Sequence, residues 1–287
     1  MVAELSPARA RQLIPAQALA RVPGYSPAAR IAALAGGTVN KTFRVETSDG
    51  RFIVRLHDAS GIELGADHIR EAHLQNAAAA AGVAPTVLHV DSQQRFMVSE
   101  YIDGRVWTAA DFADADRLRE LGATLRRLHD VVPPIAAPFD LAALLRSFSD
   151  RLMRLDPAER PLITQLMERA EASLRKCGTA GRAPSLFHSD LQHSNIIEAR
   201  DKLFLIDWEY AAVGDPLFDL ACVLAYYPHA LPHASDLLGA AGLGGSATLP
   251  MLEHATWLYV LLSFFWDRSR RLGELPGAGI RLPTPSD

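Results

Sequence analysis

The chain has 287 residues, of which 49% are hydrophobic and 22% charged, and its formal net charge is −4. This length suits one large domain or two lobes, and the slightly acidic balance argues against a nucleic-acid-binding protein, which usually carries a basic face. No apolar run of about eighteen residues predicts a membrane-spanning helix, and the N-terminus lacks the apolar region of a signal peptide. Cys177 and Cys222 form no metal or disulfide pattern, so the cytoplasm is the expected compartment.

The first hundred residues predict a lobe built on an antiparallel sheet. One or two short helices are expected in residues 3–30, and a longer helix over residues 64–81. Alternating apolar residues bounded by turn residues predict five strands, at 31–34, 41–47, 51–56, 85–90 and 95–100. We therefore expect an α+β fold with an N-terminal lobe over residues 1–100, a linker at about 100–107 and a mostly helical lobe over 108–287.

Two loops of the N-terminal lobe are candidates for contact with a nucleotide. Gly36 and Gly37 separate the first two strands, and paired glycines let backbone N–H groups approach a phosphate closely. The alternative is an ordinary glycine turn. Where the last strand ends, the backbone from Glu100 to Ile102 carries donors and acceptors that suit the edge of an adenine.

A cation in the third strand is a further candidate. Arg55 lies in an apolar strand, so it needs an anionic partner unless it faces solvent at an edge. Glu71, in the helix that follows, is the candidate partner. Such a pair would point at the α- and β-phosphates of a nucleotide, as a strand lysine does in protein kinases.

Helical periodicity dominates the second half of the chain. Helices are predicted over residues 111–130 and 250–272, and residues 141–177 predict two amphipathic helices that divide near Asp156 and Pro157. Asp215 and Pro216 are typical of the start of another helix. Asp219 lies one turn into that helix among apolar residues, and we expect backbone N–H groups of the loop at 188–195 to bind its carboxylate in a structural role.

Residues 188–209 (HSDLQHSNIIEARDKLFLIDWE) carry the densest set of candidate catalytic side chains. A charged turn at 199–202 predicts a hairpin, which would bring Asp190, Asn195 and Asp207 together. The spacing of His188, Asp190 and Asn195 matches the kinase pattern H-x-D-x-x-x-x-N, in which the aspartate accepts a hydroxyl proton. Oxygen atoms of Asn195 and Asp207 suit Mg²⁺. Inert solvated carboxylates are the alternative, which the joint spacing disfavours.

The last predicted helix is rich in aromatic residues. Tyr259 and Trp266 are seven residues apart and share a face, and so do Trp257 and Phe264. Aromatic side chains at helical spacing usually form core. The alternative is that some line a pocket for a cationic substrate through cation–π contacts.

Four motifs, GGTVNKTFRV, FIVRL, HSDLQHSN and LIDWEYAAVGDPLFDLA, resemble the choline/ethanolamine kinase family within the aminoglycoside phosphotransferase superfamily. The resemblance implies a bilobal protein-kinase-like fold and an ATP- and Mg²⁺-dependent transfer of the γ-phosphate to a small alcohol, choline or ethanolamine before others. The arginine at position 55, where protein kinases have a lysine, is a further feature in which the chain resembles choline kinases.

The resemblance also assigns roles to residues. Asp190 is implied as the catalytic base, and Asn195 and Asp207 as ligands of Mg²⁺. Glu209 is implied as a ligand of a second metal ion or as a carboxylate on the substrate side. Arg55 with Glu71 is implied to bind the ATP phosphates, and Thr38 and Asn40 to lie in the loop above them. His188 and Asp219 are implied to have structural roles. The implied substrate pocket contains Tyr210, Trp257, Tyr259 and Trp266.

Three alternatives remain open. In the first, the same reaction uses another alcohol as acceptor, namely thiamine, an aminoglycoside, methylthioribose or homoserine. An aminoglycoside would require a wider and more acidic pocket than choline. Protein phosphorylation is disfavoured because no activation loop follows Asp207. A nucleotide-binding pseudoenzyme or scaffold is disfavoured because all the key polar residues are present.

Overall fold

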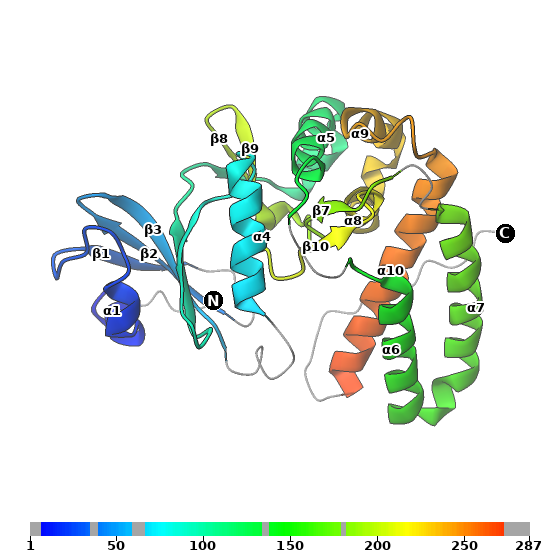
Figure 1. Cartoon of the computed structure of the whole chain (residues 1–287), viewed down its shortest axis with the longest axis horizontal. Coiled ribbons are helices and arrows are strands. Elements are labelled where there is room, and N and C mark those ends of the chain that lie inside the picture. The colour runs from blue at the N-terminus through cyan, green and yellow to red at the C-terminus, as the bar shows by residue number, and fades with distance from the viewer. Residues whose placement is uncertain (1–6, 35–39, 59–66, 134–137, 179–181, 273–287) are drawn as a thin grey trace. The chain divides into compact units, whose positions relative to one another are not determined.

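The computed structural model describes residues 7–34, 40–58, 67–133, 138–178 and 182–272 (Figure 1). The predicted phosphate-loop residues Gly36, Gly37 and Thr38 lie outside these ranges. The chain forms two compact units, one of residues 1–106 and 195–211 and the other of residues 107–194 and 212–287. The first contains the larger sheet and the second is mostly helical, so the α+β class is confirmed.

The first unit is built on a five-stranded sheet of order β1-β2-β3-β5-β4, in which all neighbours are antiparallel (Figure 1). The predicted five-stranded antiparallel sheet is thereby confirmed. The strands are β1 (Arg30–Leu34), β2 (Lys41–Thr47), β3 (Gly50–Leu56), β4 (Val87–Val90) and β5 (Phe96–Glu100).

The two faces of this sheet are covered differently. One face forms a buried core with residues from the short helices α1 (Pro7–Leu13) and α2 (Ala16–Leu19), and this core includes Val54. Met97 of the opposite face packs with Ala72 of helix α4 (His68–Ala80), whose N-terminus is capped by Asp67. Because strand side chains alternate between faces, Arg55 points away from the Val54 core and toward α4.

A hairpin of β8 (Ile196–Ala199) and β9 (Lys202–Leu205) also belongs to the first unit, with β6 (Arg105–Val106) paired to β8. Its turn residues Arg200 and Asp201 have φ of 54° and 56°, as a two-residue hairpin turn requires. The N–H of Ile206 donates to the carbonyl of Asn195 at 3.0 Å. The ladder therefore places Asn195 and Asp207 at the same end of the hairpin.

Over its described residues, the second unit contains five longer helices, the short helix α9 and a two-stranded sheet. Helices α6, α7 and α10 lie side by side (Figure 1). They bury a common core of Leu145, Leu152, Ile163, Leu261 and Phe265. The elements are α5 (Ala115–His129), α6 (Leu141–Leu155), α7 (Arg160–Cys177), α8 (Leu217–Tyr226), α9 (Ala234–Ala240), α10 (Leu249–Leu272), β7 (Ser185–Phe187) and β10 (Ala212–Gly214), with short 3-10 turns at Ala109–Ala113, Pro157–Glu159, His193–Asn195 and Pro228–His233.

Local sequence explains where these helices begin. Asp114 and Asp140 cap α5 and α6 by accepting hydrogen bonds from the first-turn N–H groups. The predicted division of residues 141–177 is present, because Asp156 ends α6 and caps the Pro157 turn. Among the helices of the described ranges, none is both long and apolar enough to cross a membrane.

Candidate active site

Arg55 is buried between two carboxylates of the first unit. Its Nη2 forms a short ion pair with Glu71 Oε1, and its Nη1 donates to Asp207 Oδ1 at 3.1 Å. The side chains of Arg55 and Glu71 are only 11% and 2% exposed. Burial alone would raise the pKa of Glu71, but the charge of Arg55 and the hydrogen bond from His68 outweigh it and lower that pKa to about 2. The ion pair expected between Arg55 and Glu71 is therefore present, with both groups charged at neutral pH.

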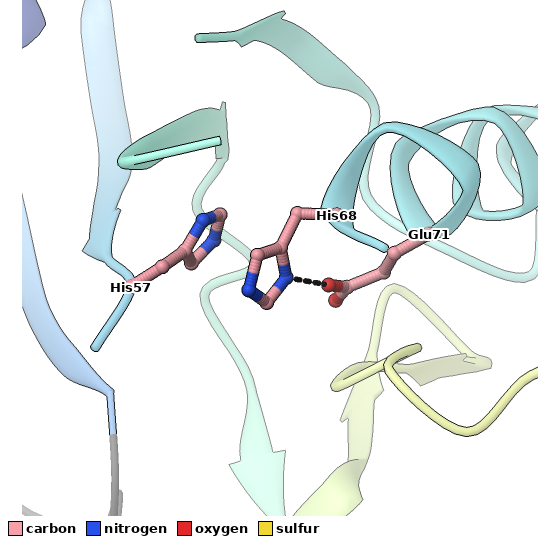
Figure 2. Close-up of side chains that lie close together, drawn as sticks. All are labelled: His57, His68 and Glu71. Carbon is pink, nitrogen blue, oxygen red and sulfur yellow. Dashed lines mark hydrogen bonds and ion pairs between the residues drawn. The ribbon is translucent and has the colours of Figure 1, made fainter. Parts of the chain in front are cut away.

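Two histidines extend this network (Figure 2). His68 Nδ1 lies 2.8 Å from Glu71 Oε2, on the side away from Arg55. The ring of His57 stacks on that of His68, with a centroid distance of 3.5 Å and an interplanar angle of 22°. Neither histidine was identified from the sequence, since they are eleven residues apart and belong to no recognised motif. The available signal was the position of His68 three residues before Glu71, a spacing at which two side chains of a helix are neighbours.

The end of the hairpin gathers oxygen atoms near Arg55. Asp207 has φ of 66°, in the left-handed region that aspartate tolerates better than most residues. Partial desolvation and the neighbouring Asp207 carboxylate raise the pKa of Glu209, while Arg55 opposes that rise. Asn195 is 8% exposed at the start of β8. A divalent cation would relieve the repulsion between the two carboxylates, so these carboxylates and the adjacent carboxamide fit Mg²⁺.

The other residues predicted to contact a nucleotide lie at strand ends of the first unit. Asn40 Oδ1 accepts a hydrogen bond from the N–H of Asp58 at 3.3 Å, which ties the start of β2 to the end of β3. The N–H of Glu100 donates to the carbonyl of Thr86 at 3.0 Å. Ile102 follows two residues later and is half-buried.

In the second unit, Asp219 holds the loop that carries Asp190. Asp219 is fully buried, and its Oδ1 accepts hydrogen bonds from the N–H groups of His188 and Ser189 at 2.9 and 2.8 Å. Its Oδ2 lies 3.0 Å from His129 Nε2. Ser189 has φ of 67°, a strained conformation that the surrounding hydrogen bonds maintain. The backbone hydrogen bonds expected for Asp219 are therefore present.

Neutral donors surround Asp190 itself. Its Oδ1 accepts hydrogen bonds from Gln192 Nε2 at 3.0 Å and Tyr226 Oη at 3.2 Å, and its own N–H donates to His188 Nδ1 at 3.2 Å. Burial and the charge of Asp190 raise the pKa of Tyr226, so the phenol stays protonated as a donor. Sequence reasoning missed Gln192 and Tyr226. The spacing of seven between Asp219 and Tyr226 on α8 was the usable signal, because it places them on one helix face.

The aromatic residues predicted to line a substrate pocket have different surroundings. Tyr259 Oη donates to the carbonyl of Ser189 at 2.8 Å, and its ring lies 5.8 Å from that of Tyr226. The guanidinium of Arg169 lies 4.4 Å from the Trp257 ring, and that of Arg270 lies 4.5 Å from the Trp266 ring. In the first unit, Tyr210 is 44% exposed. Of these four, the structure brings Tyr259 to the Asp190 loop.

Comparison with known proteins defines the class of protein. Residues 30–253 match the phosphotransferase enzyme family, and the chain belongs to this family. Protein LicA from Haemophilus influenzae is 25% identical over 215 residues, which cover 71% of this chain and 60% of that protein. A LicA homologue from Metamycoplasma hominis is 27% identical over 186 residues, 64% of this chain and 68% of that protein. The chain thus spans well under the full length of the Haemophilus relative.

Solved structures share the fold. A choline/ethanolamine kinase family protein from Mesorhizobium loti superimposes with a TM-score of 0.70 at 23% identity, covering 91% of this chain and 94% of that one. Choline kinase LicA from Streptococcus pneumoniae gives 0.71 at 16% identity, covering 86% and 88%. The ADP-bound aminoglycoside phosphotransferase APH(2'')-Ib gives 0.66 at 17% identity, covering 91% of each chain. The chain therefore shares its fold with proteins named choline kinase and aminoglycoside phosphotransferase.

Proposed function

We propose that the chain transfers the γ-phosphate of ATP to the hydroxyl group of a small cationic alcohol, choline or ethanolamine before others. The observation that carries this proposal is the set of side chains around the Asp190 carboxylate. A loop carboxylate at kinase spacing has the half-buried ring of Tyr226 beside it, and an anion next to an aromatic ring attracts an alkylammonium group. The relatives named choline kinase and ethanolamine kinase support this substrate class.

In this proposal Asp190 accepts the proton of the attacking hydroxyl. Gln192 and Tyr226 fix the carboxylate through Oδ1, and His188 fixes the backbone at Asp190. Asp219 acts one step further away by holding the N–H groups of His188 and Ser189. A general base is effective only within hydrogen-bonding reach of its proton, so this double support of the loop is a requirement of the reaction.

The ATP side of the proposal rests on the first unit. Arg55, aligned by Glu71, binds the phosphates as a bidentate donor. Asn40 follows Gly36, Gly37 and Thr38 in the sequence, and these four residues are the ones proposed for the loop above the phosphates. The backbone from Glu100 to Ile102 is proposed to bind the adenine edge. Asn195, Asp207 and Glu209 would hold Mg²⁺, which when bound neutralises negative charge on the phosphate oxygens.

The cationic end of the acceptor is assigned to Tyr226 and Tyr259. Their rings are in edge-to-face contact with each other, with centroids 5.8 Å apart at an interplanar angle of 69°. Tyr210 and Glu209 remain candidates for the substrate side. Trp257 and Trp266 are weaker candidates, because each ring already has an arginine stacked on it.

The test is ADP release by the full chain with ATP and Mg²⁺ against choline, ethanolamine, thiamine, an aminoglycoside, methylthioribose and homoserine. The proposal expects the highest kcat/KM with choline or ethanolamine. A preference for one of the other alcohols would contradict the substrate class but leave the phosphotransfer intact. Nucleotide binding without turnover on any alcohol would contradict the phosphotransfer and favour a scaffold.

A further inference from the structure

We propose that His57, His68 and Glu71 form a binding site for a zinc-type divalent ion, different in its ligands from the oxygen donors assigned to Mg²⁺. One potential ligand atom from each of the three residues lies within 4.8 Å of the other two (Figure 2). His57 follows the last residue of β3, and His68 and Glu71 occupy the first turn of α4. Two imidazoles with one carboxylate select Zn²⁺, Co²⁺ or Ni²⁺ over Mg²⁺, which prefers oxygen.

His57 has an unused lone pair on its buried ring nitrogen. Its Nδ1 lies 2.6 Å from the carbonyl of Gln94, which only accepts, so the ring proton is on Nδ1 and Nε2 carries a lone pair. His57 Nε2 is buried and has no hydrogen-bond partner within the described part of the chain. A carbonyl that fixes the tautomer of a ligating histidine in this way is a recurrent feature of metal sites. Burial and the charge of Arg55 lower the pKa of His57 to about 4, which keeps the ligand neutral at pH 7.

His68 and Glu71 already have a separation close to that of two ligands of one ion. Their Nδ1 and Oε2 atoms are 2.8 Å apart, while two ligands of tetrahedral zinc at bond lengths of about 2.1 Å are about 3.4 Å apart. An ion there would take the place of the hydrogen between His68 Nδ1 and Glu71 Oε2, and a neutral His68 would then carry its ring hydrogen on Nε2. The ring of His57 is stacked on that of His68, so it must turn to bring Nε2 to the ion as the third ligand, and a fourth position is left for water.

Occupancy of this site would oppose phosphotransfer, an effect that rests on the proposed role of Arg55. Glu71 holds Arg55 with Oε1 and would hold the ion with Oε2. A second positive charge on the same carboxylate weakens its attraction for Arg55. The guanidinium that binds the ATP phosphates would then be less firmly aligned, so zinc should raise the KM for ATP. The site is inhibitory in this account.

The test is titration of the EDTA-dialysed full chain with Co²⁺, followed by its visible absorbance, and then with Zn²⁺ in competition. We expect one equivalent to bind, and the substitution His57→Phe, which keeps a stacking ring but removes the ligand, to weaken binding by at least about 10-fold. His73→Ala is the matched control, because His73 is exposed on the same helix. Equal affinity in the two variants, or no stoichiometric binding by the wild type, would overturn the proposal.

The consequence is measured separately, as the KM for ATP with and without one equivalent of Zn²⁺. We expect a rise in the wild type and in His73→Ala, and none in His57→Phe. Circular dichroism of His57→Phe checks that the variant is folded, and His68→Ala supplies a second ligand deletion. Metal binding is read without ATP, so its failure leaves the proposed phosphotransfer standing. Conversely, an inactive chain that binds Co²⁺ would contradict the phosphotransfer alone.

Discussion

The two units each bury an acidic residue that organises a candidate site, and they stabilise it in different ways. In the first unit, Glu71 is held by the cation Arg55 and by His68, both side chains. In the second, Asp219 is held by the N–H groups of His188 and Ser189 and by His129. A pair of side-chain charges responds to pH and to other ions, whereas backbone donors hold a loop in one conformation. The comparison suggests that the first unit is the adjustable part and the Asp190 loop the fixed part.

Asp219→Ala should give the largest loss of stability. It leaves two buried N–H groups without their acceptor, and each such group costs about 1–3 kcal/mol, so we expect roughly 3–5 kcal/mol in total. Urea unfolding measures the change. The control is Asp236→Ala, because Asp236 is 46% exposed in a surface pair with Arg119 and should change stability by about 0.5 kcal/mol or less. Equal losses of stability in the two variants would contradict the role of Asp219 in holding the Asp190 loop.

Glu71→Gln should have a smaller effect on stability, because Asp207 still pairs with Arg55. Leaving the buried guanidinium with one anion instead of two should cost roughly 2–3 kcal/mol. The KM for ATP should rise by about 10-fold or more, since Arg55 is no longer aligned. Glu46→Gln is the control, because Glu46 pairs with Arg44 in a partly exposed bridge worth about 0–1 kcal/mol. An unchanged KM for ATP would contradict the role of the Arg55–Glu71 pair.

The charge-based unit should also respond to acid. The pKa of Glu71 is lowered from 4.5 to about 2 on folding, so its contribution is complete above pH 4.5 and is lost as the pH falls from 4.5 toward 2. Urea unfolding of metal-free protein across this interval should show a steeper loss of stability in the wild type than in Glu71→Gln. Parallel curves for the two proteins would show that Glu71 is not perturbed.

Tyr226→Phe should have the smallest effect, because it removes one hydrogen bond to Asp190 and keeps the ring. A hydrogen bond to a charged group contributes about 1.5–3 kcal/mol, and because Gln192 keeps its own hydrogen bond to Oδ1, kcat should fall by about 10-fold. The KM for choline should be nearly unchanged, since the ring that contacts the cation remains. Steady-state kinetics separate the two parameters. A large rise in the KM for choline with kcat unchanged would assign Tyr226 to binding through its hydroxyl instead.

Most of the larger elements could be predicted from the sequence, because their periodicity extends over several residues. The strand at 41–47 follows from alternation, and the break between α6 and α7 follows from Asp156 and Pro157. Strands β7 (Ser185–Phe187) and β10 (Ala212–Gly214) are only three residues long, so neither shows a period. They gain stability by pairing with each other across an intervening hairpin, which no local pattern reveals.

The sequence predicted those site residues that belong to one motif, and those buried charged residues whose partner lies in a neighbouring element. The partners of Arg55 and Asp219 followed from the need of a buried charge for a counterpart. The contacts of Tyr226 with Asp190 and of His57 with His68 depend on how the chain returns on itself over distances that sequence spacing does not encode. Tyr226 and His57 were therefore missed, although the proposed substrate preference depends on the first and the proposed metal site on the second.

The central claim is that Asp190 is the base of an ATP-dependent phosphotransfer to a small alcohol. Its most direct test is ADP release by Asp190→Asn with the preferred alcohol, measured beside Mg²⁺-dependent ATP binding of the same variant. We predict that kcat falls by about 10²- to 10⁴-fold, the usual contribution of a general base, while the affinity for ATP stays within about 2-fold of the wild type. Turnover near the wild-type rate would contradict the account.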